Sequence, residues 1–327
     1  MKSIFCFFAP GVQVAKEPLS RISPHGKLLD NLQYDPSCLI VTHEARLNSS
    51  QNGVLSVQES WGEYPELENP QVGDKVVSWD FEHNNLAVLY DLFDYFDPVT
   101  ERGYLSNGPF RASCNSTESQ ITDDWSHMNS VSVSAFDGSL IVSIRHLSTV
   151  CSFQAPPLLA SINWCISSEL PQRSNYTFDK SATKFYDQHA VQQLSSGNLI
   201  MFDNGDARVM GNYSGGGYTS RGLELKLDRD TMVASVVWEF PVTYDSHEGS
   251  VYPLDNGHFL IHEPNNGGDA AMMQRMNGDE SVRGISRQVE VDSDGTEVAS
   301  LYTSIYLYTA YRGVPFSTLL GEVRQQD

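Results

Sequence analysis

Short apolar segments rich in Val, Ile, Leu, Tyr and Phe alternate along the chain with turns rich in Gly, Asn, Asp and Pro. Strand-like pairs flank an Asn-Asn turn within residues 73–92, an Asp-Arg-Asp-Thr turn within 220–240, and an Asp-Gly turn within 286–302. Such pairs around tight turns are typical of β-hairpins. Long segments with helical periodicity are nearly absent, so the sequence predicts an all-β chain. Residues 91–102 are the main exception, and we expect a loop or a helical turn there.

A longer repeat is superimposed on the hairpins, and each copy begins with a histidine. Segments that start at His43, His127, His189 and His247 each pass through a short strand, turn at a glycine and continue into an apolar strand; the histidines are 84, 62 and 58 residues apart. This repeat suits the antiparallel blades of a β-propeller, because one blade cannot bury both faces without neighbours. Equivalent blade positions face a central channel, so the histidines are predicted to meet at its mouth.

Composition limits the partners that such a fold can have. With 327 residues, 40% hydrophobic and 19% charged, the chain can bury a large core, and we expect a single propeller domain over 1–327. The 41 acidic and 21 basic residues give a net charge of −20, which repels nucleic acid and anionic membrane surfaces. No apolar run is long enough to predict a membrane span. The sequence gives no indication of the oligomeric state.

Cysteines and glycosylation sequons bear on the compartment. Five cysteines form no C-x-x-C pair and no Cys/His ligand spacing, so no structural metal site is predicted and the disulfide pairing stays open. Residues 1–30 read either as the remnant of a signal peptide or as a first-blade strand. Four sequons favour a secreted protein or one of the secretory pathway, although about as many arise by chance and the cytoplasm stays open. They lie at Asn48, Asn115, Asn175 and Asn212.

Several longer motifs together resemble one known family. The segment DDWSHMNS begins at Asp123, and the arginine of SIRHLSTV, Arg145, lies 18 residues after His127. Further on stand DQHAVQQLSSGNLIMFDNG and GSVYPLDNGHFLI. Over roughly His43 to Arg312 the chain closely resembles the arylsulfotransferase family. That resemblance implies a six-bladed propeller that moves a sulfuryl group from a phenolic sulfate to another phenol. It implies a histidine as transient carrier, with no cofactor, no metal and no nucleotide sulfate donor.

The resemblance also assigns roles to individual residues. His189 matches the carrier histidine, and Arg145 matches the sulfate-binding arginine. His127 and Asn129 match the pair that faces the channel, and His43 matches the first-blade histidine. The expected catalytic residues are therefore His189, His127 and Arg145, with His43, Asn129 and Arg145 binding the substrate. The implied partners are small molecules, an aryl sulfate and a phenol.

The chemistry of these residue types agrees with such roles. Sulfuryl transfer, like phosphoryl transfer, spreads negative charge over equatorial oxygens, so catalysis depends on positioning and electrostatic stabilisation. The guanidinium of Arg145 suits those oxygens, and a neutral imidazole on His189 is a competent nucleophile near neutral pH. His127 can give a proton to the leaving phenolate and later take one from the acceptor. Because the chain is acidic, the positive charge at the site must be a local feature.

Plainer interpretations apply to the neighbouring residues, and two other functions stay open. His247 is expected at the rim or surface. If the strand alternation continues past Arg145, His146 lies on the opposite face and is packed or exposed. Trp125 is expected to pack between blades.

One alternative function is a sulfatase-like hydrolase, in which water hydrolyses the sulfo-histidine intermediate. The other is a non-catalytic propeller that binds a carbohydrate or a protein, because fold does not fix function.

Overall fold

Antiparallel β-sheets account for nearly all the regular structure in the part of the chain that the structure describes. A computed structural model describes residues 4–6, 20–22, 28–31, 41–47, 52–110, 121–155, 161–206, 219–264 and 284–305; side chains are described for residue 46 and for residues 52–107, 121–155, 161–206, 219–264 and 286–302. Within these residues, three short 3₁₀ helices interrupt the strands: η1 (Leu92–Asp94), η2 (Arg145–Leu147) and η3 (Ser181–Thr183). The expected helical turn within 91–102 corresponds to η1 and the turns that follow it. Among the described residues, no helix is long and apolar enough to cross a membrane.

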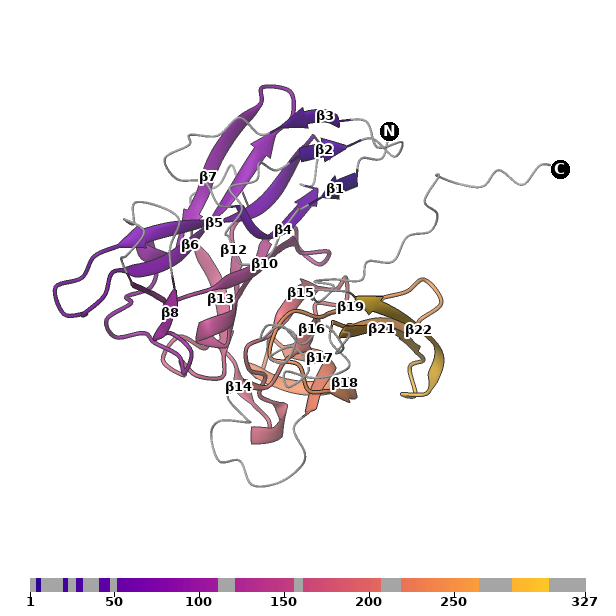
Figure 1. Ribbon diagram of the computed structural model, residues 1–327. Helices are drawn as coiled ribbons and strands as arrows, with labels where there is room; N and C mark the ends of the chain where they lie inside the picture. Colours follow the sequence, from indigo (N-terminus) through magenta and orange to yellow (C-terminus); the bar gives the residue numbers. More distant parts are fainter. Residues whose placement is uncertain are drawn as a thin grey trace.

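Four sheets each contain four sequence-consecutive antiparallel strands. Their strands are β4 (Val41–Leu47), β5 (Gly53–Gly62), β6 (Gln71–Asp80) and β7 (Asn85–Asp91); β10 (Met128–Val133), β11 (Leu140–Ile144), β12 (Thr149–Phe153) and β13 (Ile162–Ser167); β15 (His189–Gln193), β16 (Leu199–Asp203), β17 (Thr219–Asp228) and β18 (Val233–Thr243); β19 (Ser250–Pro253), β20 (Phe259–Glu263), β21 (Gly284–Val291) and β22 (Glu297–Ile305). Figure 1 shows the four sheets following one another in space in the order in which they occur along the chain.

Short strands extend this arrangement at three places. A separate sheet contains β1 (Ile4–Cys6), β2 (Ser20–Ile22) and β3 (Leu28–Asn31). The strands β8 (Gly108–Phe110) and β9 (Thr122–Asp124) join the β4–β7 sheet beside β6, and β14 (Thr177–Phe178) pairs in parallel with β18. No described sheet closes on itself, so the all-β architecture is established, whereas closure and the six blades implied by the resemblance stay predictions.

Alternation along the strands places successive residues in different hydrophobic cores. On β11, Val142 packs in the core that also contains Val57 and Val76, whereas Ile141 packs against Val191 on the other face. Likewise on β16, Leu199 and Met201 face the β10–β13 sheet, and Ile200 and Phe202 face the β19–β22 sheet. Each middle sheet is therefore apolar on both faces, and each buries both against a neighbour, as a stack of blades requires.

The first strand of three of these sheets is irregular next to its histidine. The pairing register shifts between Thr42 and Ala45, between Met128 and Ser130, and between His189 and Gln192. These bulges bend the strand and redirect a side chain, a common device beside functional sites. The backbone is also left-handed at His127, Ala190 and Glu248, with φ of 47°, 55° and 66°. The sequence repeat thus corresponds to a structural repeat in which the chain turns sharply at each histidine segment.

Gly249 provides a test of this turn geometry. Its φ is +99°, and a Cβ there would lie 2.5 Å from Cδ1 of the buried Phe202. We expect Gly249→Ala to lower the free energy of unfolding by about 2 to 4 kcal/mol, because left-handed strain and overpacking add. Gly257 has a φ of +82° with no atom within 4 Å, so Gly257→Ala should cost only about 1 kcal/mol. Urea unfolding of both variants checks this; equal losses would contradict it.

Candidate active site

His127 lies directly before β10, and its ring is held by the end of β9. Its Nδ1 makes a short contact with a carboxylate oxygen of Asp124. Burial alone would raise the pKa of Asp124, but its interactions with His127, His146 and Arg145 hold this pKa well below its usual range. A permanent carboxylate therefore accepts the Nδ1 proton and fixes the orientation of the ring. The side chain of His127 is 22% exposed, so the ring reaches solvent.

His146 supports both His127 and Arg145. Its ring stacks on that of His127 with centroids 4.6 Å apart, and its Nδ1 lies 2.7 Å from the backbone carbonyl oxygen of Asp124. Burial lowers the pKa of His146 to about 3, so the ring is neutral and its Nε2 accepts from Nη1 of Arg145 at 2.7 Å. The expectation that strand alternation turns His146 away from Arg145 is wrong, because residues 145–147 form the 3₁₀ helix η2 instead of continuing β11.

Arg145 joins three of the sheets at one point. Its Nη2 donates to a carboxylate oxygen of Asp206 at 3.1 Å and to the backbone carbonyl of Ser246 at 3.0 Å. Asp206 follows β16, and Ser246 precedes β19. The Nε atom is buried and has no hydrogen-bond partner among the described residues. The site thus contains one buried guanidinium, and the carboxylate of Asp206 is paired with it.

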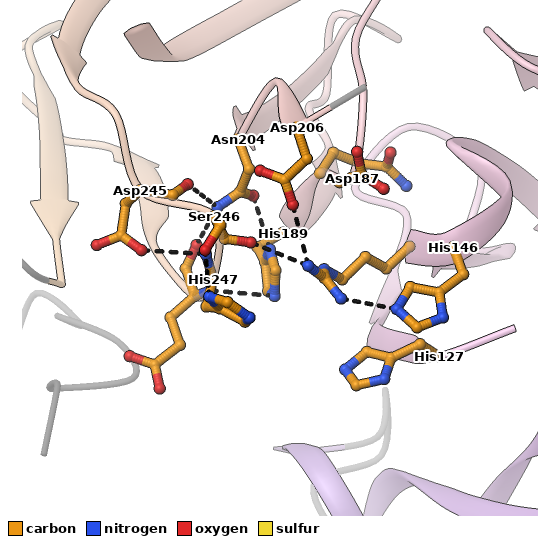
Figure 2. Close-up of polar contacts among 12 residues, drawn as sticks. His127, His146, Asp187, His189, Asn204, Asp206, Asp245, Ser246 and His247 are labelled. Carbon is orange, nitrogen blue, oxygen red and sulfur yellow. Dashed lines mark hydrogen bonds and ion pairs between the residues drawn. The ribbon is translucent and has the colours of Figure 1, made fainter. Parts of the chain in front are cut away.

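His189 is the first residue of β15, and its ring lies between Asn204 and Glu248. Its Nδ1 lies 2.7 Å from Oδ1 of Asn204, and its Nε2 accepts from the backbone N–H of Glu248 at 3.2 Å. The side chain is 3% exposed. Figure 2 shows His189 next to Asn204 and His247, with the stacked pair of His127 and His146 on the other side. The structure therefore brings three of the four histidine segments together.

The structure describes the side chain of Asn129 but not that of His43. Asn129 is fully buried, and its Nδ2 donates to the backbone carbonyl of Gln188 at 2.8 Å. This bond ties β10 to the residue before His189. His43 belongs to β4, at the register shift after Thr42, but its side chain lies outside the described residues. Its expected role in substrate binding stays a prediction, as does that of Asn129.

His247 lies at the edge of the site and still contacts solvent. Its Nδ1 makes a short contact with the hydroxyl of Ser246. Partial desolvation, followed by the charges of Arg145 and His127, lowers its pKa, so it is neutral near pH 7. A rim position agrees with the weak sequence signal at this histidine. Trp125, also expected to pack, is fully buried and stacks on Phe93 at 5.2 Å.

Asp124, His127 and His146 are the one cluster of ligand-type side chains within the described residues that is close enough to share a metal ion. The stacked rings are inclined by only 24°, so their nitrogen lone pairs run side by side and do not converge on one point. Both nitrogens of His146 are also occupied, by the carbonyl of Asp124 and by Arg145. This geometry suits hydrogen bonding better than the convergent ligation of a zinc ion.

Sequence reasoning missed the residues that hold the predicted ones. Asp124, Asn204 and Asp206 contact His127, His189 and Arg145 through their side chains. Asp124 stands within the quoted DDW motif, and Asn204 and Asp206 stand in Asp203–Asp206, immediately after an apolar strand. A cluster of acidic and amide residues at the end of a buried strand was the available signal. Its partners were not visible, because they come from other repeats.

Comparison with known proteins finds one family that matches most of the chain. The Arylsulfotransferase (ASST) family description matches residues 12–312, nearly the whole chain. The chain therefore belongs to the arylsulfotransferase family, and its membership supports a sulfotransferase that acts on small aryl substrates. No curated protein matches significantly.

Solved structures are similar only at a coarse level. A protein from Lactobacillus plantarum shares 12% identity, with a TM-score of 0.36, over 88% of this chain and 74% of that one. The WD40 domain of coronin from Toxoplasma gondii shares 10% identity, with a TM-score of 0.35, over 91% of this chain and 56% of that one. A putative 6-phosphogluconolactonase from Bacteroides uniformis shares 9%, with a TM-score of 0.32, over 89% and 93%. Similarities this low support no conclusion about the candidate site.

Asp74 makes the stability of this site dependent on pH. Its buried carboxylate accepts from the hydroxyl of Ser126 and the backbone N–H of Met128, each at 2.6 Å, and so fixes both neighbours of His127. Burial, aided by the charge of Asp124, raises the pKa of Asp74 to about 7. The proton is therefore bound more tightly in the folded state, and this contribution to stability is lost as pH rises from about 4 to about 7.

We expect Asp74→Asn to remove that dependence, since the amide oxygen can accept both bonds without a charge. Relative to the wild type, the variant should gain roughly 2 to 4 kcal/mol between pH 4 and pH 8. Urea unfolding of both proteins at the two pH values measures the difference. A difference in unfolding free energy that does not change with pH would contradict the assignment.

Proposed function

We propose that the protein transfers a sulfuryl group from an aryl sulfate to a phenol through a sulfo-histidine on His189. The observation that carries this proposal is the orientation of two histidines from different repeats. His127 and His189 each have Nδ1 held by a side chain. The backbone N–H of Arg145 donates to the carbonyl of His127, and its Nη2 donates to the carbonyl of Ser246, in the segment whose Glu248 N–H contacts His189. A nucleophile, a proton carrier and an anion-binding cation are the three groups that this transfer needs.

The first half-reaction consumes the donor. The lone pair of His189 Nε2 attacks sulfur, so an N–S bond forms and the bond between sulfur and the aryl oxygen breaks. His127, doubly protonated beside Asp124, gives its Nε2 proton to the departing phenolate. The Arg145 guanidinium stabilises the sulfuryl oxygens; its Nε needs a partner, and its Nη2 can exchange the Ser246 carbonyl for one of them.

The second half-reaction reverses these steps with a new phenol. The acceptor gives its proton to His127 as its oxygen attacks sulfur, and the N–S bond breaks to return His189. Atoms and charge balance over the cycle without a metal or a second cofactor. Binding of the donor must also replace the 3.2 Å bond from the Glu248 N–H to Nε2, which is long enough to be exchanged.

A burst experiment tests the covalent step. Mixed with 4-nitrophenyl sulfate alone, the protein should release about one equivalent of nitrophenol rapidly, and added phenol should restore steady turnover. His189→Asn should abolish the burst and leave the fold intact, because a carboxamide is a very poor nucleophile. Mass spectrometry of donor-treated protein should find the sulfuryl group on His189. An active His189→Asn variant, or an adduct elsewhere, would overturn the mechanism.

The same experiment separates the alternatives. A sulfatase-like hydrolase would release nitrophenol steadily without any phenol. A propeller that only binds carbohydrate or protein would release none. Retention of His127, Arg145 and His189 in one cluster supports chemistry over a binding role, since a scaffold does not need that set.

For the compartment, we propose the secretory pathway. Two neighbouring features support it. Cys151 and Cys165 lie opposite each other on β12 and β13 and form a disulfide, which persists in oxidising compartments. The sequon residue Asn175 is exposed, and its amide oxygen accepts from the backbone N–H of Cys165 at 2.8 Å. Its amide nitrogen, the atom to which a glycan bonds, takes no part in that bond.

This proposal can be checked on protein purified from the source organism. Without reductant, Cys151 and Cys165 should resist alkylation, and both should react after reduction and unfolding. The peptide that contains Asn175 should lose a glycan mass on treatment with peptide N-glycosidase. Free thiols at both cysteines in the unreduced, unfolded protein would contradict export. An unmodified Asn175 would contradict passage through a glycosylating compartment.

A further inference from the structure

Asn204 has no assigned role, yet its amide is one of the most constrained groups at the site. It is fully buried at the end of β16. Its Nδ2 donates to the backbone carbonyls of Asp245 at 2.9 Å and Glu248 at 3.1 Å. An amide nitrogen has two protons, so these two bonds use both of them. The orientation of the amide is therefore set by the backbone of another repeat, and Oδ1 must face His189.

That orientation determines which nitrogen of His189 carries the proton. Oδ1 of Asn204 can only accept, so the bond of 2.7 Å requires a proton on Nδ1. On the other side of the ring, the Glu248 N–H can only donate, so Nε2 must present a lone pair. Two independent partners thus select the same neutral tautomer. His189 needs that tautomer in order to attack through Nε2.

The chemical type of the partner differs between the two histidines. His127 is held by the carboxylate of Asp124, and a negative partner stabilises the doubly protonated ring that a proton carrier needs. His189 is held by a neutral amide, which fixes the tautomer without favouring protonation of Nε2. A ring protonated at Nε2 has no lone pair there for attack on sulfur. The carboxylate therefore suits a histidine that carries a proton, and the amide suits a histidine that acts as the nucleophile.

We propose that Asn204 is a positioning residue that keeps His189 protonated at Nδ1 and unprotonated at Nε2, while Asp124 makes His127 the proton carrier. The inference rests on the proposed function and deepens it. After Nε2 bonds to sulfur, the ring carries a positive charge, and the amide oxygen cannot remove the Nδ1 proton. The leaving group of the second transfer is then a neutral imidazole and not an imidazolate, so the N–S bond breaks more readily.

Single-turnover release of the phenol from two sulfate donors distinguishes the role of Asn204 from that of Asp124. With donor alone, Asn204→Ala should slow the burst from 4-nitrophenyl sulfate and from phenyl sulfate alike, by roughly 10- to 100-fold. Asp124→Asn keeps an oxygen for Nδ1 but loses the charge, so it should slow the nitrophenyl burst much less than the phenyl sulfate burst. It should slow phenyl sulfate by about tenfold or more, because the poorer leaving group needs the proton.

The matched control is Asn198→Ala. Asn198 lies in the turn before β16, at the far end of the same sheet, and its Nδ2 donates to Glu224 at 2.7 Å. It should behave like the wild type. An Asn204→Ala protein with a wild-type burst for both donors would overturn the proposal, as would a loss for only one donor.

A spectroscopic test needs neither a variant at Asn204 nor activity. In ¹⁵N-histidine-labelled wild-type protein, two-bond ¹H–¹⁵N correlations report which ring nitrogen is protonated. The His189 signals are those missing from His189→Asn. At pH 7.5 they should show a proton on Nδ1 only, and a proton on Nε2 would overturn the proposal even if Asn204→Ala fails to fold. If the wild type releases no phenol, the proposed function fails, while this measurement still decides the role of Asn204.

Discussion

The need of each sheet to bury two apolar faces underlies the rest of this structure. A strand such as β16 sends Leu199 into one core and Ile200 into the next, so no sheet of this kind is stable in water by itself. Stacking satisfies both faces, and it also brings the first strands of successive sheets together. The polar segments that precede those strands then meet at one end. The position of the site thus follows from how the apolar residues are buried.

Within that frame, one buried guanidinium holds the polar segments together. Arg145 contacts His146 from its own 3₁₀ helix, Asp206 after β16, and the Ser246 carbonyl before β19. Separating a buried charge from its partners costs several kcal/mol, so these contacts fix the relative positions of three segments.

The sequence was sufficient for the features that repeat. Strand pairs around tight turns predicted the all-β class, and the repeated histidine segments with the family resemblance pointed to His127, Arg145 and His189, which lie in one cluster. Sequence reasoning failed where local backbone geometry or contacts with residues distant in the sequence determine the structure. His146 was assigned to the wrong face, because nothing in the neighbouring sequence indicates a 3₁₀ turn after β11. Asn204 was overlooked because its role depends on the carbonyls of Asp245 and Glu248, about 40 residues away.

Asn204, Arg145 and the Glu248 backbone each reach across to a different repeat. No single sheet, and no pair of sheets, contains the whole set of contacts around His189 and Arg145. A nascent or nicked chain with one sheet undocked has the same side chains but lacks their orientation. Assembly of this site is therefore a late event in the maturation of this chain, and it requires the last interacting sheet to dock.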